Sequence, residues 1–258
     1  MDDPRPLADI LRPQTLDEVV GQEHLVGKSG ILRKLLASGF LPSIIFWGPP
    51  GSGKTTLAAL LANLTNSYFV HKSAVTATLA DVRSVVKEAQ QRIQTTEERT
   101  VLFIDEIHRF NKAQQDALLP HVEHGTVIFI GATTENPSFE VISPLLSRCR
   151  VFVLKQLEDA DLDNIIDRGL SYIKRRIADR ARAFLKEIAN GDARAVLTIL
   201  EIASQIVRDK TLTVSHIEEA AQRKMLQYDR LGEEHYNTIS AYIKSMRASD
   251  VNAALYYL

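Results

Sequence analysis

An eight-residue glycine-rich segment constrains this chain more than any other feature. It matches the pattern G-x-x-x-x-G-K-[ST] in full and lies between an apolar run at residues 44–47 and a helical pattern at 54–64. In that setting the backbone forms a nest of N–H donors for phosphate oxygens, and the following helix presents its positive end to the same anions. The residues expected to bind the nucleotide here are Gly48, Pro49, Pro50, Gly51, Ser52, Gly53, Lys54, Thr55 and Thr56. We expect Lys54 to reach the β- and γ-phosphates and Thr55 to bind Mg²⁺.

The rest of the chain predicts an α/β fold followed by a helical region. Short, continuous apolar runs, typical of strands buried on both faces, occur at residues 44–47, 68–70, 101–104, 127–130 and 151–154. Helical patterns separate them, including one at 111–122, so we expect a parallel five-stranded sheet with flanking helices over residues 1–155. Beyond residue 155 only helical spacing remains, with helix starts at Asp192 and Ser215. This predicts an all-α lid at 156–226 and the start of a further helical domain at 227–258.

Composition excludes several classes of protein. The formal net charge is -1, so overall charge gives no indication of nucleic-acid binding. Cys149 is the single cysteine, which rules out a disulfide framework and suits a reducing compartment; we expect it to be a small buried residue. Neither a secretory signal nor an apolar run long enough to cross a membrane is present. The interpretation is a cytoplasmic protein without a membrane partner, associated with the nucleoid if it is bacterial.

Two acidic residues follow the apolar run at 101–104. Asp105 is expected to help hold Mg²⁺, and Glu106 to act as the base that polarises the attacking water. Hydrolysis of a phosphoanhydride uses such a pair, because the metal neutralises phosphate charge while a second carboxylate orients the nucleophile.

Three further roles, which sense or stabilise the γ-phosphate, have candidate side chains in the sequence. Thr133 follows the fourth apolar run and is the expected sensor, with Asn136 as the second choice. Arg148 is expected to enter a neighbouring subunit's site as an arginine finger, with Arg150 as its rival. Arg194, near the start of a lid helix, is expected to couple lid position to the nucleotide.

Together these motifs resemble those of the AAA+ superfamily and its clamp-loader branch. The resemblance is closer to the replication-associated recombination proteins (RarA/MgsA) and their eukaryotic relative, the Werner-helicase-interacting protein. The segments that carry it span residues 5–8, 12–13, 20–22, 47–51, 103–116, 119–123 and 131–139, with His235-Tyr236 and Ser240-Ala241 near the end.

The resemblance implies a DNA-stimulated ATPase at stalled or damaged replication forks that uses ATP/ADP and Mg²⁺ at sites shared between subunits. It implies DNA and single-strand DNA-binding protein as partners, and a homo-oligomer, usually a tetramer, held largely by a C-terminal domain. Because the chain stops at Leu258, we expect most of that domain to be missing. The family also places the adenine base against the segment Val19, Val20, Gly21 and Gln22.

Possible DNA contacts and other functions stay open at this point. One basic cluster is suited either to phosphate binding or to a solvated helix face, and comprises Lys174, Arg175, Arg176, Arg180, Arg182 and Lys186. A second candidate set for DNA contact is His108, Arg109 and Lys112, whose alternative role is to anchor the local helix. The alternative functions are a clamp-loader subunit or Holliday-junction motor, a P-loop kinase, and a slowly hydrolysing scaffold. Arg148 and Arg194 argue against the kinase, and the Asp105–Glu106 pair argues against an inactive scaffold.

Overall fold

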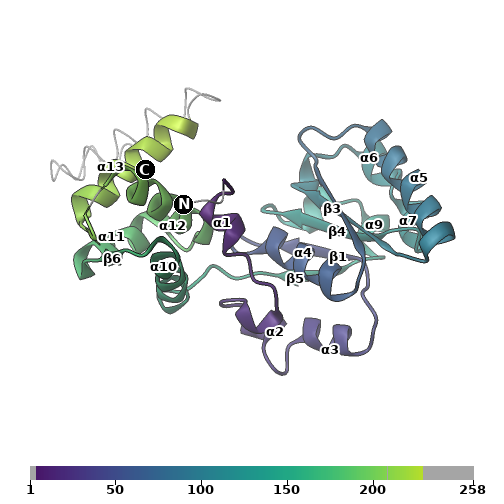
Figure 1. The fold of residues 1–258 in the computed structure, drawn as a ribbon. Helices are drawn as coiled ribbons and strands as arrows, with labels where there is room; N and C mark the ends of the chain where they lie inside the picture. The colour runs from purple at the N-terminus through teal and green to yellow at the C-terminus, as the bar shows by residue number, and fades with distance from the viewer. Residues whose placement is uncertain (1–3, 208, 229–258) are drawn as a thin grey trace.

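The computed structural model describes residues 4–207 and 209–228, with side chains up to residue 222. Five parallel strands form one sheet in the order β2-β3-β4-β1-β5 (Figure 1). The strands are β1 (Ile44–Trp47), β2 (Tyr68–Ser73), β3 (Thr100–Asp105), β4 (Ile128–Thr133) and β5 (Arg150–Val153). The predicted five-stranded parallel sheet is therefore confirmed.

The order of the strands brings the two phosphate-related motifs together. β4 lies between β1 and β3, and Thr133 at its end pairs with Trp47 at the end of β1. Because all the strands are parallel, their carboxyl ends lie at the same edge of the sheet. The glycine-rich loop after β1 and the acids at the end of β3 therefore flank the last residue of β4.

The central strands are buried on both faces, as their continuous apolar sequences predict. Along β3, Phe103 packs into the core on one face of the sheet, whereas Leu102 and Ile104 pack into the core on the other. Phe46 and Ile45 of β1 divide between the same two cores. Successive side chains of a strand point to opposite faces, so a strand in the middle of three layers needs apolar residues at every position.

Helices and short turns connect these strands and cover the sheet (Figure 1). They are α4 (Lys54–Leu64), α5 (Leu79–Thr96), η2 (Ile107–Arg109), α6 (Lys112–Asp116), α7 (Leu119–Glu123), α8 (Pro137–Glu140) and α9 (Ser143–Leu146). The single helix expected at 111–122 is wrong, because α6 and α7 are separate. Pro120 lies in the first turn of α7 and has no N–H to donate to the preceding turn, which favours a break before it.

A helical unit follows the sheet. It contains α10 (Asp159–Ile173), α11 (Asp179–Ala189), α12 (Ala193–Ile206) and α13 (Val214–Tyr228), around a core of its own. Asp192 caps α12 as predicted, accepting the N–H of Ala195 at 2.9 Å. Ser215 does not begin α13, which starts one residue earlier. The expectation that strands end before this unit is also wrong, since β6 (Arg176–Ile177) pairs in parallel with β7 (Thr211–Leu212).

The segment before β1 runs between the two units. It contains α1 (Leu7–Ile10), η1 (Leu16–Glu18), α2 (Glu23–Val26) and α3 (Ile31–Ala37). Leu7 is buried in the core of the helical unit, and its backbone N–H donates to Glu201 of α12 at 3.2 Å. In contrast, Leu25 and Leu32 are buried in a core of the sheet. The N-terminal segment thus packs against both units.

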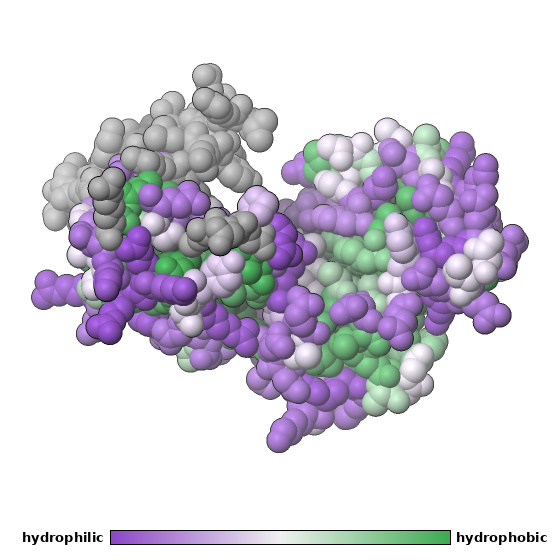
Figure 2. Space-filling view, in the orientation of Figure 1, coloured by the Kyte–Doolittle hydropathy of each residue, from purple (hydrophilic) through white to green (hydrophobic). Residues whose placement is uncertain are grey.

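Hydrophilic residues cover most of the face of both units that Figure 2 shows, and hydrophobic residues form smaller patches among them. Within residues 4–207 and 209–228, no helix has both the length and the apolar content that a bilayer span requires. The expected C-terminal domain, including His235, Tyr236, Ser240 and Ala241, lies outside the described residues, apart from the end of α13.

Candidate nucleotide site

The glycine-rich loop has the backbone geometry that its sequence predicts. Gly51 and Gly53 have φ values of 67° and 99°, in the left-handed region that favours glycine. A Cβ atom at Gly51 would also lie 2.1 Å from a carboxylate oxygen of Asp192, so the loop and the start of α12 approach too closely for any side chain there. The loop leads directly into α4, whose first residue is Lys54.

Lys54 is held over this loop. Its side chain is buried, and Nζ donates to the carbonyl oxygens of Gly48 at 2.7 Å and Pro49 at 2.9 Å. Burial lowers the pKa of Lys54, while the nearby carboxylates of Glu106 and Asp105 act in the opposite direction. The ammonium group therefore lies within the electrostatic reach of both acids, where it can meet phosphate oxygens.

The acids at the end of β3 line the same cavity as the loop. Asp105, Glu106 and Thr55 all contribute to its wall. Hydroxyl and carboxylate oxygens are the donors that Mg²⁺ prefers, and Mg²⁺ is usually held by one or two protein carboxylates together with substrate phosphates. The described residues contain no preformed group of three or more His, Cys, Asp or Glu side chains suited to a metal. The donor set thus fits a metal that arrives with a nucleotide.

The expected sensor, Thr133, is buried and is connected to Glu106 through His108. Thr133 is fully buried, and its hydroxyl lies 3.0 Å from Nδ1 of His108, whose ring nitrogen is also 3.2 Å from the Glu106 carboxylate. Asn136 instead caps α8, accepting the N–H of Ser138 at 3.0 Å. Thr133 does not line the cavity itself, but it is connected to Glu106 through His108. The sequence offered no signal for that contact beyond the proximity of His108 to the acid pair.

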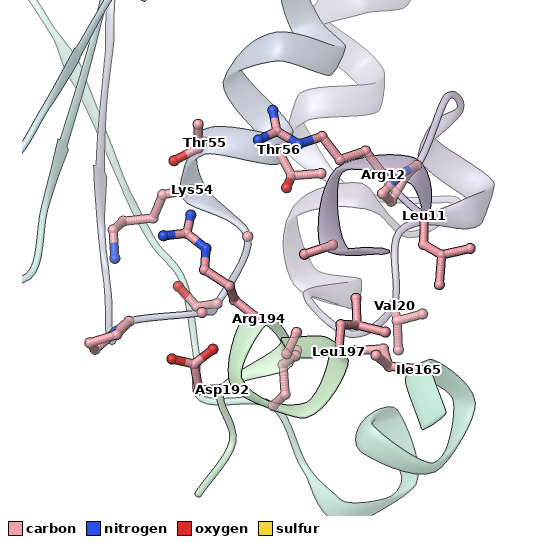
Figure 3. Close-up of a pocket in the computed structure, with 18 of the residues that line it drawn as sticks. Leu11, Arg12, Val20, Lys54, Thr55, Thr56, Ile165, Asp192, Arg194 and Leu197 are labelled. Atoms are coloured by element: carbon pink, nitrogen blue, oxygen red, sulfur yellow. The ribbon is translucent and has the colours of Figure 1, made fainter. Parts of the chain in front are cut away.

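The helical unit supplies the opposite wall of the cavity. Arg194, in the first turn of α12, lines it together with Asp192 (Figure 3). Burial is the main cause that lowers the pKa of Lys54, and the positive charge of Arg194, which lines the same cavity, lowers it further. The lid arginine chosen from the sequence is therefore brought to the cavity.

The cavity has a polar end and an apolar end. Its volume is about 690 Å³, within the range of ligand pockets. Figure 3 shows Lys54, Thr55 and Arg194 grouped at one end. The apolar side chains at the other end are Leu11, Val20, Ile165 and Leu197. This division suits a ligand with an anionic tail and a flat apolar base.

Only part of the segment 19–22, which is expected to contact the adenine base, lines the cavity. Val19 and Val20 line the cavity, whereas Gly21 and Gln22 do not. The side chain of Gln22 is buried and bonds to backbone, donating to the carbonyl of Lys155 at 2.7 Å and accepting its N–H at 2.9 Å. Gln22 therefore ties this segment to the linker between β5 and α10.

Sequence reasoning missed several residues of the cavity wall. No chemical motif in the sequence assigns Arg12 or Arg168 to the nucleotide site, yet both line the cavity. Arg12 pairs with Asp9 at 2.6 Å, and Arg168 donates to the carbonyl of Glu18 at 2.7 Å. Arg168 is 150 residues from Glu18 in sequence, so no local pattern could have revealed their contact.

The expected arginine finger lies away from the cavity. Arg148 follows α9, forms an ion pair with Glu123 of α7, and donates to the carbonyl of Pro144 at 2.6 Å. Its side chain is more than a third exposed. Arg150 is the first residue of β5, and its backbone N–H donates to Ser43 at 2.9 Å. The placement of Arg148 on the surface is compatible with a role in a neighbouring subunit's site, which stays a prediction.

Part of the basic cluster on the lid is neutralised within the chain. Arg182 pairs with Asp163 and Asp167 of α10, and Lys186 pairs with Asp163 at 2.9 Å. A hydrogen bond to Asp163 raises the pKa of Lys186, so this lysine stays charged and its charge is paired within the chain. Arg175 donates to backbone carbonyls, including that of Asp209 at 2.8 Å. Arg182 and Lys186 thus join α10 to α11, and DNA binding by the cluster stays a prediction.

Comparison with known proteins identifies two families along the chain. Residues 44–157 match the model of the ATPase family associated with various cellular activities (AAA). Residues 171–247 match the model of the AAA C-terminal domain. The first match covers the sheet, with the glycine-rich loop and the acids of the cavity, and the second covers most of the described helical unit.

Relatives and solved structures agree with these matches. The replication-associated recombination protein A of Haemophilus influenzae is 43% identical over 98% of this chain, which spans 59% of that protein. The ATPase WRNIP1 of Dictyostelium discoideum is 42% identical over 98% of this chain, which spans 32% of it. The Thermotoga maritima RuvB Holliday junction branch migration motor superposes with a TM-score of 0.68 at 29% identity, covering 92% of this chain and 80% of that one.

Proposed function

Because this chain belongs to the AAA family of ATPases and is similar to the replication-associated recombination protein A group, we propose that it is a Mg²⁺-dependent ATPase acting in replication-coupled recombination and repair. The proposed reaction is the hydrolysis of ATP to ADP and phosphate. The observation that carries it is the convergence of Lys54, Asp105, Glu106 and Arg194 on one cavity, with cations and acids at its polar end.

Each side chain has a role that follows from its position. The glycine-rich loop and Lys54 bind phosphate oxygens, and the apolar end of the cavity receives the base. Thr55 and Asp105 would hold Mg²⁺, which supplies positive charge against the phosphates. Glu106 accepts a proton from the attacking water, and Arg194 brings a lid cation to the same phosphates.

The proposed site is completed by a second copy of the chain. Arg148 is on the surface and paired with Glu123, where it cannot act in its own cavity. We propose that it enters the site of a neighbouring subunit and stabilises the charge of the transition state. A homo-oligomer, tetrameric as the family resemblance implies, follows from this proposal.

DNA is the proposed macromolecular partner. Relatives that this chain matches over nearly its whole length carry names that refer to replication and recombination. We propose that single-stranded ends, gaps or forks stimulate turnover, that single-strand DNA-binding protein recruits the ATPase to such sites, and that it works in the cytoplasm at the nucleoid. The likeness to the RuvB motor supports a second candidate, a Holliday-junction-type motor.

ATP turnover with defined DNA substrates separates these candidates. Turnover is measured over a range of protein concentrations without DNA and with single-stranded, forked or four-way-junction DNA. Stimulation by single strands and forks supports the main proposal, and selective stimulation by four-way junctions supports the motor. Turnover that is indifferent to every DNA would refute the proposed partner.

A further inference from the structure

We propose that His108 is a positioning residue that orients the carboxylate of Glu106 and ties it to the hydroxyl of Thr133. This inference rests on the proposed role of Glu106 as the base for ATP hydrolysis. In the sequence His108 is a candidate DNA contact or an anchor of the local helix, and no motif assigns it to the nucleotide site.

The local fold fixes where the ring of His108 lies. β3 ends at Asp105, and Glu106 takes a left-handed conformation with φ 55° that turns the chain into η2. Ile107 and Phe110, on either side of the turn, are buried in a core of the sheet. Because these anchors fix the backbone, His108 is directed toward the end of the neighbouring strand β4, where Thr133 lies.

The partners of the ring determine which nitrogen carries the proton. Nδ1 of His108 lies 3.2 Å from Oε2 of Glu106 and 3.0 Å from Oγ1 of Thr133. An unprotonated Nδ1 would bring its lone pair against the lone pairs of the Glu106 carboxylate, so the 3.2 Å contact favours a proton on Nδ1. The Thr133 hydroxyl donates its one proton to the carbonyl of Glu135 at 3.1 Å and so meets Nδ1 as an acceptor. The single proton on Nδ1 is therefore donated to Thr133, and the positive end of the same N–H lies beside the carboxylate of Glu106.

Glu106 needs such a tether to act as a base. About a third of its side chain is exposed, and a glutamate with that freedom samples several rotamers. Oγ1 of Thr134 lies 3.5 Å from the same carboxylate oxygen, too far for a strong hydrogen bond. His108 makes the shorter contact and also touches the expected sensor, so it connects the position of the base to the residue proposed to sense the γ-phosphate.

The geometry disfavours a direct role for His108 in binding DNA. Its side chain is only 10% exposed, and its Nδ1 is already bonded within the site. Arg109 and Lys112, the other members of that candidate set, are exposed and stay available for a partner. The three residues therefore separate into one that belongs to the nucleotide site and two that face outward.

Three substitutions at His108 test the proposal through kcat and KM. His108→Ala should lower kcat about 10- to 100-fold, the range expected when a charged group loses one polar partner, with KM for ATP changed less than about threefold. His108→Asn should restore most of the turnover, because its amide nitrogen takes the place of Nδ1. His108→Gln, whose amide lies one bond further out, should not. Unchanged kcat in His108→Ala, or equal rescue by Asn and Gln, would overturn the inference.

Two controls separate this inference from the proposed function. Glu106→Gln is measured first, and loss of turnover there establishes the base before His108 is considered. Histidine ¹⁵N NMR of the wild-type chain gives a readout that needs no turnover. A protonated Nδ1 at His108 that changes its resonance in Glu106→Gln supports the contact, whereas an unprotonated Nδ1 overturns it whatever the ATPase result.

Discussion

Replacing Gln115 with leucine should lower the free energy of unfolding of the α/β unit by about 3 kcal/mol. Gln115 is only 2% exposed, and its side chain bonds to three backbone groups that belong to different segments. Its amide nitrogen donates to the carbonyls of Phe110 and Glu140 at 3.0 Å each, and its oxygen accepts the N–H of Ile142 at 2.9 Å. Leucine keeps the volume and leaves all three groups without this partner, at about 1 kcal/mol each.

Thermal and urea unfolding of the wild type and Gln115→Leu measure this cost. A loss of about 3 kcal/mol corresponds to a fall in Tm of roughly 10 °C for a chain of this size. Gln156→Leu is the matched control, because Gln156 also makes two amide hydrogen bonds, to Asn190 at 2.7 and 3.0 Å, but is exposed. Its loss should be under about 1 kcal/mol, since water replaces the lost partners. Equal losses in the two variants would refute the reasoning from buried unsatisfied groups.

Three other predictions follow from single side chains. Lys54→Ala should weaken ATP binding at least about tenfold in a fluorescent-nucleotide titration, because it removes a charged phosphate donor; unchanged affinity would contradict the site. Glu123→Gln removes the ion pair that holds Arg148 on its own subunit. If Arg148 acts in a neighbouring subunit's site, ATP turnover should then rise at low protein concentration. A fall in turnover would count against Arg148 as an arginine finger. Burial raises the pKa of the Cys149 thiol to about 12, so the folded chain should react with iodoacetamide at pH 8 far more slowly than the chain in guanidinium. Equal rates would show that the thiol is accessible.

The sheet and the polar end of the cavity could be predicted because local sequence determines them. The glycines and Lys54 act through the backbone of one loop, and a continuous apolar strand such as 101–104 has few structural alternatives. Asp192 was identified as a helix cap because its side chain bonds only three residues away. Each of these features depends on contacts within one turn or one strand.

The rest depends on contacts between distant segments. Arg168 reaches the cavity only because α10 packs beside the N-terminal segment, and His108 meets Thr133 only because β3 and β4 are neighbours. Arg182 looked available for DNA in the sequence, but the acids that pair with it come from another helix. The break between α6 and α7 does have a local signal in Pro120, but the helical periodicity of residues 111–122 favoured one continuous helix.

The most direct test of the central claim follows ATP binding and phosphate release in the wild type and in Glu106→Gln at the same protein concentrations. If Glu106 is the base, both chains bind ATP with similar affinity, and only the wild type releases phosphate, in a Mg²⁺-dependent manner. Phosphate release by Glu106→Gln at the wild-type rate, or a wild type that binds ATP without ever hydrolysing it, would contradict the assignment of this cavity as an ATPase site.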